Sequence, residues 1–175
     1  SAASDVYKRQ GDEVAVIETG KGTIRVKLDS DGAPIHVANF CELATMGFYD
    51  GLKFHRYVPG FVIQGGCPNT RDMTCEQVAA GQAGPDGQPG TGGPGWCIQE
   101  EFSPNPRNSH EDGALAMARS MDPNSAGSQF YFCLGPQHNL DSGYTVFGAT
   151  VEGKDVIGAL RAGDEIVKVD IVHGA

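Results

Sequence analysis

Three side chains of this sequence could polarise a neutral group with hydrogen bonds. Arg56 and Gln64 lie eight residues apart on two strand-like pieces joined by a Pro59-Gly60 turn, and Gln129 lies in a later segment. A guanidinium is always charged and offers its donors in a rigid fork, while an amide both donates and accepts. The same segments contain no reactive nucleophile beside a base and no cluster of carboxylates. These groups therefore suit holding and polarising a bound molecule better than breaking a bond.

Apolar side chains accompany the three donors, among them Phe61, Val62, Tyr131 and Leu140. A prolyl peptide bond suits this combination, because it places an apolar ring beside a carbonyl and a tertiary amide. Rotation about that bond is slow because amide resonance must be lost. In the twisted state the nitrogen lone pair becomes a better acceptor, so a donor aimed there stabilises the transition state more than the ground state. Charge-assisted hydrogen bonds of roughly 1.5–3 kcal/mol each could accelerate the rotation by a few orders of magnitude.

Three blocks of sequence carry a resemblance to a known family: 54–66 (FHRYVPGFVIQGG), 127–132 (GSQFYF) and 145–148 (TVFG). In this order they closely resemble the cyclophilin family of peptidyl-prolyl isomerases, over about residues 14–172. The resemblance implies a mainly β fold, a closed eight-stranded antiparallel barrel capped by two α-helices. It also implies an enzyme that isomerises Xaa-Pro bonds in folding or flexible chains, without a metal or organic cofactor.

The resemblance assigns roles to particular residues. It implies that Arg56, Gln64 and Phe61 are catalytic residues. The substrate-binding residues that it implies are His55, Val62, Gly90, Thr91, Gly92, Ala118, Arg119, Ser120, Gln129, Tyr131, Asn139, Leu140 and Tyr144.

Some of these positions depart from the residue type common in the family. Val62 replaces a common Met, Tyr131 stands where Phe is frequent, and Arg119 replaces the Asn of many eukaryotic members. Tyr144 stands where eukaryotic members have His. Asn139 stands where cyclosporin-sensitive members carry Trp, so we expect weak cyclosporin binding.

Size and charge limit the partners of this chain. The 175 residues are expected to form one domain over 11–175, preceded by a non-native or disordered leader at 1–10 that continues no strand pattern. The net charge of −9 argues against a nucleic acid or an anionic membrane as partner, because both attract a basic face. We expect a monomer that acts on proline-containing peptides and unfolded or flexible protein chains.

The cysteines indicate a compartment. Their number, five, is odd, and the first residues contain no apolar signal core, so reduced thiols in a cytoplasm are expected. Cys41 and Cys133 fit small core positions. A metal or redox role for Cys67, Cys75 and Cys97, in or beside one long loop, is left open.

The hydrophobic pattern predicts which elements position the candidate site. Alternation predicts strands at 14–19 and 23–28 and a last strand that includes Val167 to Ile171, while short strands are expected near residues 54, 62, 98, 114, 130 and 146. Helical spacing predicts a helix from Pro34 to Gly47 and a short one at 155–160. Many short strands with only two helices indicate a closed β structure.

The segment 67–95 is rich in glycine and proline, so we expect a long loop with room for one helical turn at 74–80. Its composition favours little apolar burial, and we expect it to be dispensable for folding. Within it, 90–95 (GTGGPG) fits a dinucleotide-binding pattern, but Pro94 and Gly95 stand where the helix of that motif should run. Nucleotide binding is therefore only a distant alternative. The runner-up is a proline-peptide binding or chaperone module with little turnover, against which the retained Arg56 and Gln64 argue.

Overall fold

In the computed structural model, residues 11–174 of the chain are described. Ser1 to Gln10, the predicted leader, lie outside the described residues, and so does Ala175. No helix among the described residues is long and apolar enough to cross a membrane.

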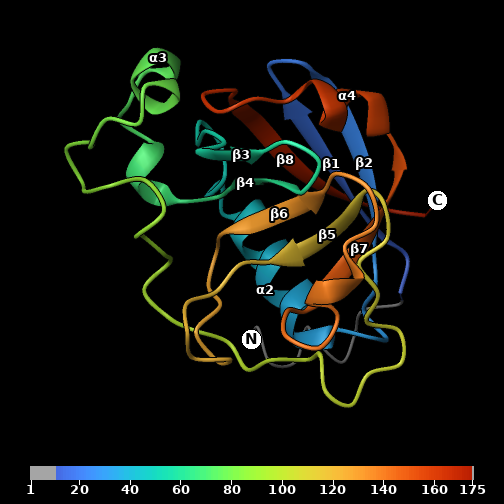
Figure 1. The fold of residues 1–175 in the computed structure, drawn as a ribbon. Helices are drawn as coiled ribbons and strands as arrows, with labels where there is room; N and C mark the ends of the chain where they lie inside the picture. Colours follow the sequence, from blue (N-terminus) through green and yellow to red (C-terminus); the bar gives the residue numbers. More distant parts are fainter. Residues whose placement is uncertain (1–10, 175) are drawn as a thin grey trace.

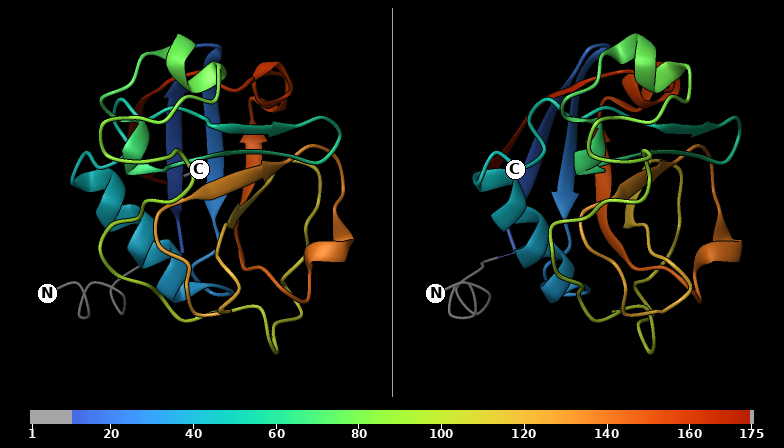
Figure 2. Two further views of the ribbon diagram at one scale, coloured as in Figure 1. Left: turned by 60° about the vertical axis from the view of Figure 1, so that its left-hand side comes forward. Right: turned by 90° about the vertical axis from the view of Figure 1, so that its left-hand side faces the viewer.

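An eight-stranded antiparallel sheet organises the fold, in the order β3-β4-β6-β5-β7-β2-β1-β8. It curves into a half-barrel, so that β1 and β2 (blue) cross β6 (orange) at a large angle in Figure 2. The strands are β1 (Glu13–Thr19), β2 (Gly22–Leu28), β3 (Arg56–Val58), β4 (Val62–Gly65), β5 (Ala114–Met117), β6 (Phe130–Cys133), β7 (Val146–Glu152) and β8 (Ile166–His173).

The prediction of a closed barrel is wrong, because β3 and β8 are the two edges of an open sheet. The two sides of the gap are joined instead by residues outside regular strands. Gly51 donates its N–H to the Ile166 carbonyl at 2.8 Å, Phe54 donates to the Asp164 carbonyl at 2.9 Å, and Lys53 forms an isolated bridge with Glu165. A three-residue β3 and the turns before it cannot supply a continuous ladder, so the closure is local.

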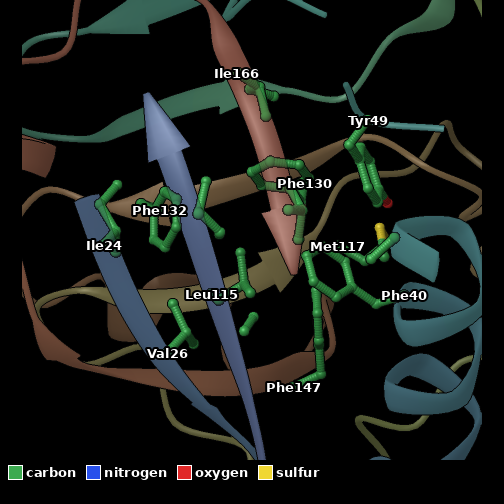
Figure 3. Packing of buried hydrophobic residues seen from close by; sticks show 14 of the residues in the cluster. Ile24, Val26, Phe40, Tyr49, Leu115, Met117, Phe130, Phe132, Phe147 and Ile166 are labelled. Carbon is green, nitrogen blue, oxygen red and sulfur yellow. The ribbon is translucent and has the colours of Figure 1, made fainter. Parts of the chain in front are cut away.

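Alternation decides which face of each strand is buried. In β6, Phe130 and Phe132 point into the interior, where they meet Phe40 of helix α2 (Pro34–Thr45) and Leu115 of β5 (Figure 3). Helix α2 begins at Pro34 as predicted and buries Val37, Phe40, Cys41 and Ala44 at helical spacing. The opposite face of β4, β5 and β6 is therefore free to carry a site.

The remaining helices are short. Helix α4 (Lys154–Ala159) is close to its predicted position, and α3 (Cys75–Ala79) is the single turn foreseen in the long loop, capped by Thr74 and Gln77. Figure 1 shows α3 and its flanking loop (green) at one side of the molecule, away from α2. Two further turns are 3₁₀ helices, η1 (Pro68–Thr70) and η2 (His138–Leu140). The strand expected near Ile98 is wrong, because Ile98 forms only an isolated bridge with Ala126.

Candidate active site

Strand register brings three predicted site residues, Arg56, Gln64 and Tyr131, into one row, which continues to Ala116 on a fourth strand. Arg56 of β3 lies opposite Gln64 of β4, Gln64 lies opposite Tyr131 of β6, and Tyr131 lies opposite Ala116 of β5. Directly opposed residues of antiparallel strands point to the same face. Because the flanking residues Ile63 and Phe132 fill the interior, this row occupies the outer face.

A chain of side-chain hydrogen bonds runs along one end of this row. The exposed Arg56 donates from Nη1 to Gln64 Oε1 at 3.4 Å, and Gln64 Nε2 donates to Gln129 Oε1 at 3.0 Å. Gln129 Nε2 in turn donates to the carbonyls of Gly90 and Gly92, at 2.9 and 2.8 Å. This amide chain (Arg56, Gln64, Gln129) orients each amide and leaves most of the Arg56 donors free for a bound molecule.

Cys67 also binds the glycine loop at residues 90–92, a contact that was not predicted from the sequence. Its buried Sγ accepts the N–H groups of Gly90 and Gly92, both at 3.3 Å. The preceding residue, Gly66, has a φ of +89°, a conformation that favours glycine. A Cβ added there would lie 2.6 Å from the Ser128 carbonyl oxygen. The predicted groove-edge residues 90–92 are therefore fixed through both their N–H and their carbonyl groups.

The predicted apolar residues also come together on the outer face. Val62 and Tyr131 are buried there, and Phe61, Leu140 and Tyr144 pack on them half-buried. We call the whole set the apolar cluster; it comprises Phe61, Val62, Ala114, Ala116, Ala118, Tyr131, Cys133, Leu140, Tyr144 and Val146. It adjoins the amide chain through the opposition of Gln64 and Tyr131.

Arg119 braces one side of the apolar cluster. Its guanidinium lies over the Tyr144 ring, with 4.7 Å from Cζ to the ring centroid, and its Nε donates to the Gly143 carbonyl at 2.7 Å. Its neighbour Ser120 donates its backbone N–H to Ser125 Oγ at 2.9 Å. Arg119 and Ser120 therefore stiffen the chain that borders the site.

A groove of about 590 Å³ lies beside the amide chain. It is lined by Gln64, residues 90–97, Ala118, Arg119, Ser120, Ser125 and residues 127–129. The half-exposed Trp96 forms part of its wall and donates from Nε1 to Asn39 Oδ1 at 2.9 Å. The predicted residue Asn139 lies apart from this groove, exposed on η2.

His55 lies under the loop at Gly90, where an added Cβ would be 3.3 Å from His55 Nε2. Burial and, to a smaller extent, the charge of Arg56 lower the pKa of His55 to about 4. The imidazole is therefore neutral at pH 7. Its buried Nδ1 has no hydrogen-bond partner among the described residues.

The role of His110, a buried histidine that contacts Tyr131, was also not predicted from the sequence. His110 Nε2 lies 2.8 Å from the Tyr131 hydroxyl, and His110 Nδ1 lies 2.8 Å from Asp141 Oδ1. The only sequence signal was the tyrosine itself, because a buried hydroxyl needs a partner.

Within residues 11–174, no three His, Cys, Asp or Glu side chains are grouped so that they could hold a metal ion. Cys67 is buried beside Gly90 and Gly92, Cys75 is half-buried at the start of α3, and Cys97 is exposed at the groove. Their different surroundings give no support to the shared metal or redox role that was left open.

Comparisons with known proteins identify the family of this chain. Residues 14–173 match the family described as "Cyclophilin type peptidyl-prolyl cis-trans isomerase/CLD". The chain is 44% identical over 163 residues to a peptidyl-prolyl cis-trans isomerase of Synechococcus elongatus, covering 92% of this chain and 97% of the relative. It is 40% identical over 148 residues to peptidyl-prolyl cis-trans isomerase B of Bacillus subtilis, covering 85% of this chain and 90% of the relative.

Solved structures resemble the fold. A cyclophilin-type isomerase of Cryptosporidium parvum superposes with a TM-score of 0.76 at 24% identity, covering 94% of this chain and 99% of that one. A crystal structure of that protein in the presence of the dipeptide Ala-Pro gives a TM-score of 0.71 at 26% identity, covering 93% and 99%.

Proposed function

Because this chain belongs to the family of cyclophilin-type peptidyl-prolyl cis-trans isomerases, we propose that the amide chain and the apolar cluster together form its active site. The observation that carries the proposal is the row Arg56, Gln64 and Tyr131, which sets a charged donor beside an aromatic floor. In this arrangement an Xaa-Pro bond would lie between the two.

Arg56 is proposed as the electrostatic catalyst. As the prolyl bond twists, its nitrogen gains a localised lone pair, and a guanidinium N–H aimed at that nitrogen stabilises the twisted state. Arg56 is exposed, and among the described residues its guanidinium has one hydrogen bond, a long contact to Gln64, so its donors can turn to the substrate. Gln64 is held by Gln129 and is proposed to position the peptide next to Arg56.

Phe61, Tyr131 and Leu140 are proposed to hold the proline ring. They are half-buried or buried in one cluster, so an apolar ring placed on them loses contact with water. Gly90, Thr91, Gly92, Ala118 and Ser120 border the adjoining groove and are proposed to contact the peptide backbone on either side of the proline.

A proline-binding module with little turnover would need the apolar cluster but not Arg56. The two are separated by an exchange measurement on one short Xaa-Pro peptide, in which NMR follows both binding and interconversion of the cis and trans forms. An isomerase at catalytic concentrations produces exchange cross-peaks between the cis and trans resonances of the peptide. Binding without accelerated exchange would show that the protein is a proline-binding module and not an isomerase.

The same titration locates the site. Because the chain contains a single tryptophan and Trp96 lines the groove, its fluorescence reports binding there. Backbone amide shifts are expected at 90–92 and 118–120. Shifts confined to a second groove, which is lined by Lys27, Asp31 and Lys154 among others, would contradict the proposed site.

A monomeric state and a cytoplasmic location stay proposals. They are supported only by the odd number of cysteines and the acidic charge of the chain. Sedimentation of the purified protein tests the first.

A further inference from the structure

The hydrogen bonds behind the apolar cluster lead from Tyr131 to residues that do not line the cluster. Tyr131 is 4% exposed and His110 is fully buried. The two rings are stacked, with 5.9 Å between centroids and 13° between planes, and the hydroxyl meets His110 Nε2 at 2.8 Å. Tyr131 is thus attached at its hydroxyl as well as packed at its ring.

Asp141 fixes which nitrogen of His110 carries the proton. Its Oδ1 accepts the His110 backbone N–H at 2.7 Å and lies 2.8 Å from His110 Nδ1. A carboxylate can only accept, so Nδ1 carries hydrogen and Nε2 of the neutral ring is an acceptor. Burial lowers the pKa of His110 although Asp141 acts in the opposite direction, and burial raises the pKa of Tyr131. The Tyr131 hydroxyl therefore donates a hydrogen bond to His110 Nε2.

Asp141 is itself held in place. His138 Nδ1 lies 2.9 Å from Asp141 Oδ2, and Asp141 follows Leu140, a member of the apolar cluster, at the end of η2. The Asp141 carbonyl also accepts from Asn108 Nδ2 at 2.6 Å. The same carboxylate therefore orients His110 and lies next to a second residue of the proposed proline pocket.

We infer that His110 is a positioning residue for peptide binding: it fixes the Tyr131 ring through its hydroxyl, with Asp141 setting its orientation. The inference rests on the proposed pocket formed by Phe61, Tyr131 and Leu140. His110 does not touch the substrate. Its loss loosens the surface that receives the proline ring, so KM rises while kcat, which depends on Arg56, changes little.

Two substitutions of His110 separate the contacts. His110→Asn retains an amide near the position of Nδ1, facing Asp141, and loses the acceptor for Tyr131. His110→Gln places an amide oxygen near the position of Nε2 and retains the Tyr131 contact. One neutral hydrogen bond is lost in the first case, so we expect KM to rise about fivefold for His110→Asn and less than about twofold for His110→Gln.

Tyr131→Phe removes the hydroxyl and keeps the ring, with less risk to folding. It is expected to raise KM about as much as His110→Asn, and the double variant is expected to be no worse than either single one, because both remove the same bond. His173→Asn, an exposed histidine paired with Asp12, is the control. Each variant is assayed well below its unfolding temperature, so that reduced stability alone leaves KM unchanged.

The outcomes distinguish this inference from the pocket on which it rests. If Phe61→Ala leaves KM unchanged, the pocket assignment fails and the inference with it. If Phe61→Ala raises KM but His110→Asn and Tyr131→Phe do not, or if the two effects add, the pocket stands and His110 has no positioning role. If His110→Gln is as impaired as His110→Asn, the bond to Tyr131 is not what matters, and the inference is also overturned.

Discussion

Gln64 Nε2 and Gln129 Oε1 lie 3.0 Å apart, although 65 positions separate the two residues in sequence. This contact joins the catalytic candidate Arg56 to the loop at Gly90 and Gly92, because Gln64 accepts from Arg56 and Gln129 donates to the loop carbonyls. A substitution that affects the loop should therefore also affect the orientation of the donor.

Arg56→Lys should lower kcat strongly, by about tenfold or more, while peptide affinity and stability stay nearly unchanged. Lysine keeps the charge but not the planar fork, and the lost contact belongs mainly to the twisted transition state. Arg56 is exposed, so its replacement leaves no buried group unpaired. Arg25→Lys is the control, because Arg25 is partly exposed, lies near Glu152 and belongs to no part of the proposed site. Full activity of Arg56→Lys in the exchange measurement would exclude Arg56 as the catalyst.

Phe61→Ala should behave differently and raise the dissociation constant of the same peptide. Phe61 packs half-buried on Val62 and Tyr131, so its loss removes apolar surface that holds the ground state as well as the transition state. Affinity is measured by Trp96 fluorescence and turnover by exchange. An unchanged affinity with reduced turnover would mean that Phe61 acts only in the transition state.

Cyclosporin should inhibit this protein weakly, and Asn139→Trp should strengthen the inhibition. Asn139 is exposed on η2, and a tryptophan there would add a large apolar face with one N–H donor. Inhibition of both proteins is titrated in the isomerase assay, with Gln137→Trp on the same segment as the control. Inhibition of the unsubstituted protein in the nanomolar range contradicts this prediction.

The packing of the long loop favours a contribution to stability, contrary to the expectation from its composition. Thr70, Met73 and Val78 are buried, and Thr70 accepts the Lys53 backbone N–H at 3.0 Å through its Oγ1 and the Lys53 Nζ at 3.2 Å through its carbonyl. Replacing 70–88 by a short Gly-containing link should therefore cost several kcal/mol and lower Tm by about 10 °C. Shortening only the mostly exposed 82–86 is the control. Equal Tm values for the two deletions would restore the original expectation.

Stability should fall as pH is lowered from about 6.5 to about 4, in part because of His55. The pKa of His55 is about 4 in the folded protein, below its usual 6.5, so the unfolded chain binds more protons in that window. The loss attributable to His55 is on the order of 2–3 kcal/mol. His110, whose pKa is also lowered, acts in the same direction, whereas His138, whose pKa is raised, acts in the opposite one.

Urea unfolding at pH 7, 5.5 and 4.5 measures this dependence. The His55→Asn variant should lose less stability between pH 7 and 4.5 than the unsubstituted protein does. Identical slopes for the two proteins would show that His55 is not the titrating group.

The sequence alone was sufficient for the elements whose pattern is local. Alternation located β1, β2 and β8, and helical spacing with Pro34 located α2, because side-chain direction follows directly from the period of a strand or helix. The resemblance of three sequence blocks also placed Arg56, Gln64, Phe61, Tyr131 and Leu140 in one candidate site, which stays a proposal. That identification came from the order of the blocks and not from any single residue.

Only the tertiary structure decided contacts between distant segments. Helix α2 has no side-chain cap of its own; Glu101 accepts the backbone N–H groups of Ile35 and His36, at 3.1 and 2.7 Å. The open sheet, the Cys67 contact under the glycine loop and the bond of His110 to Tyr131 are of the same kind. Hydrogen bonds and strand edges depend on which segments meet in space, and the local pattern of a sequence carries no record of that.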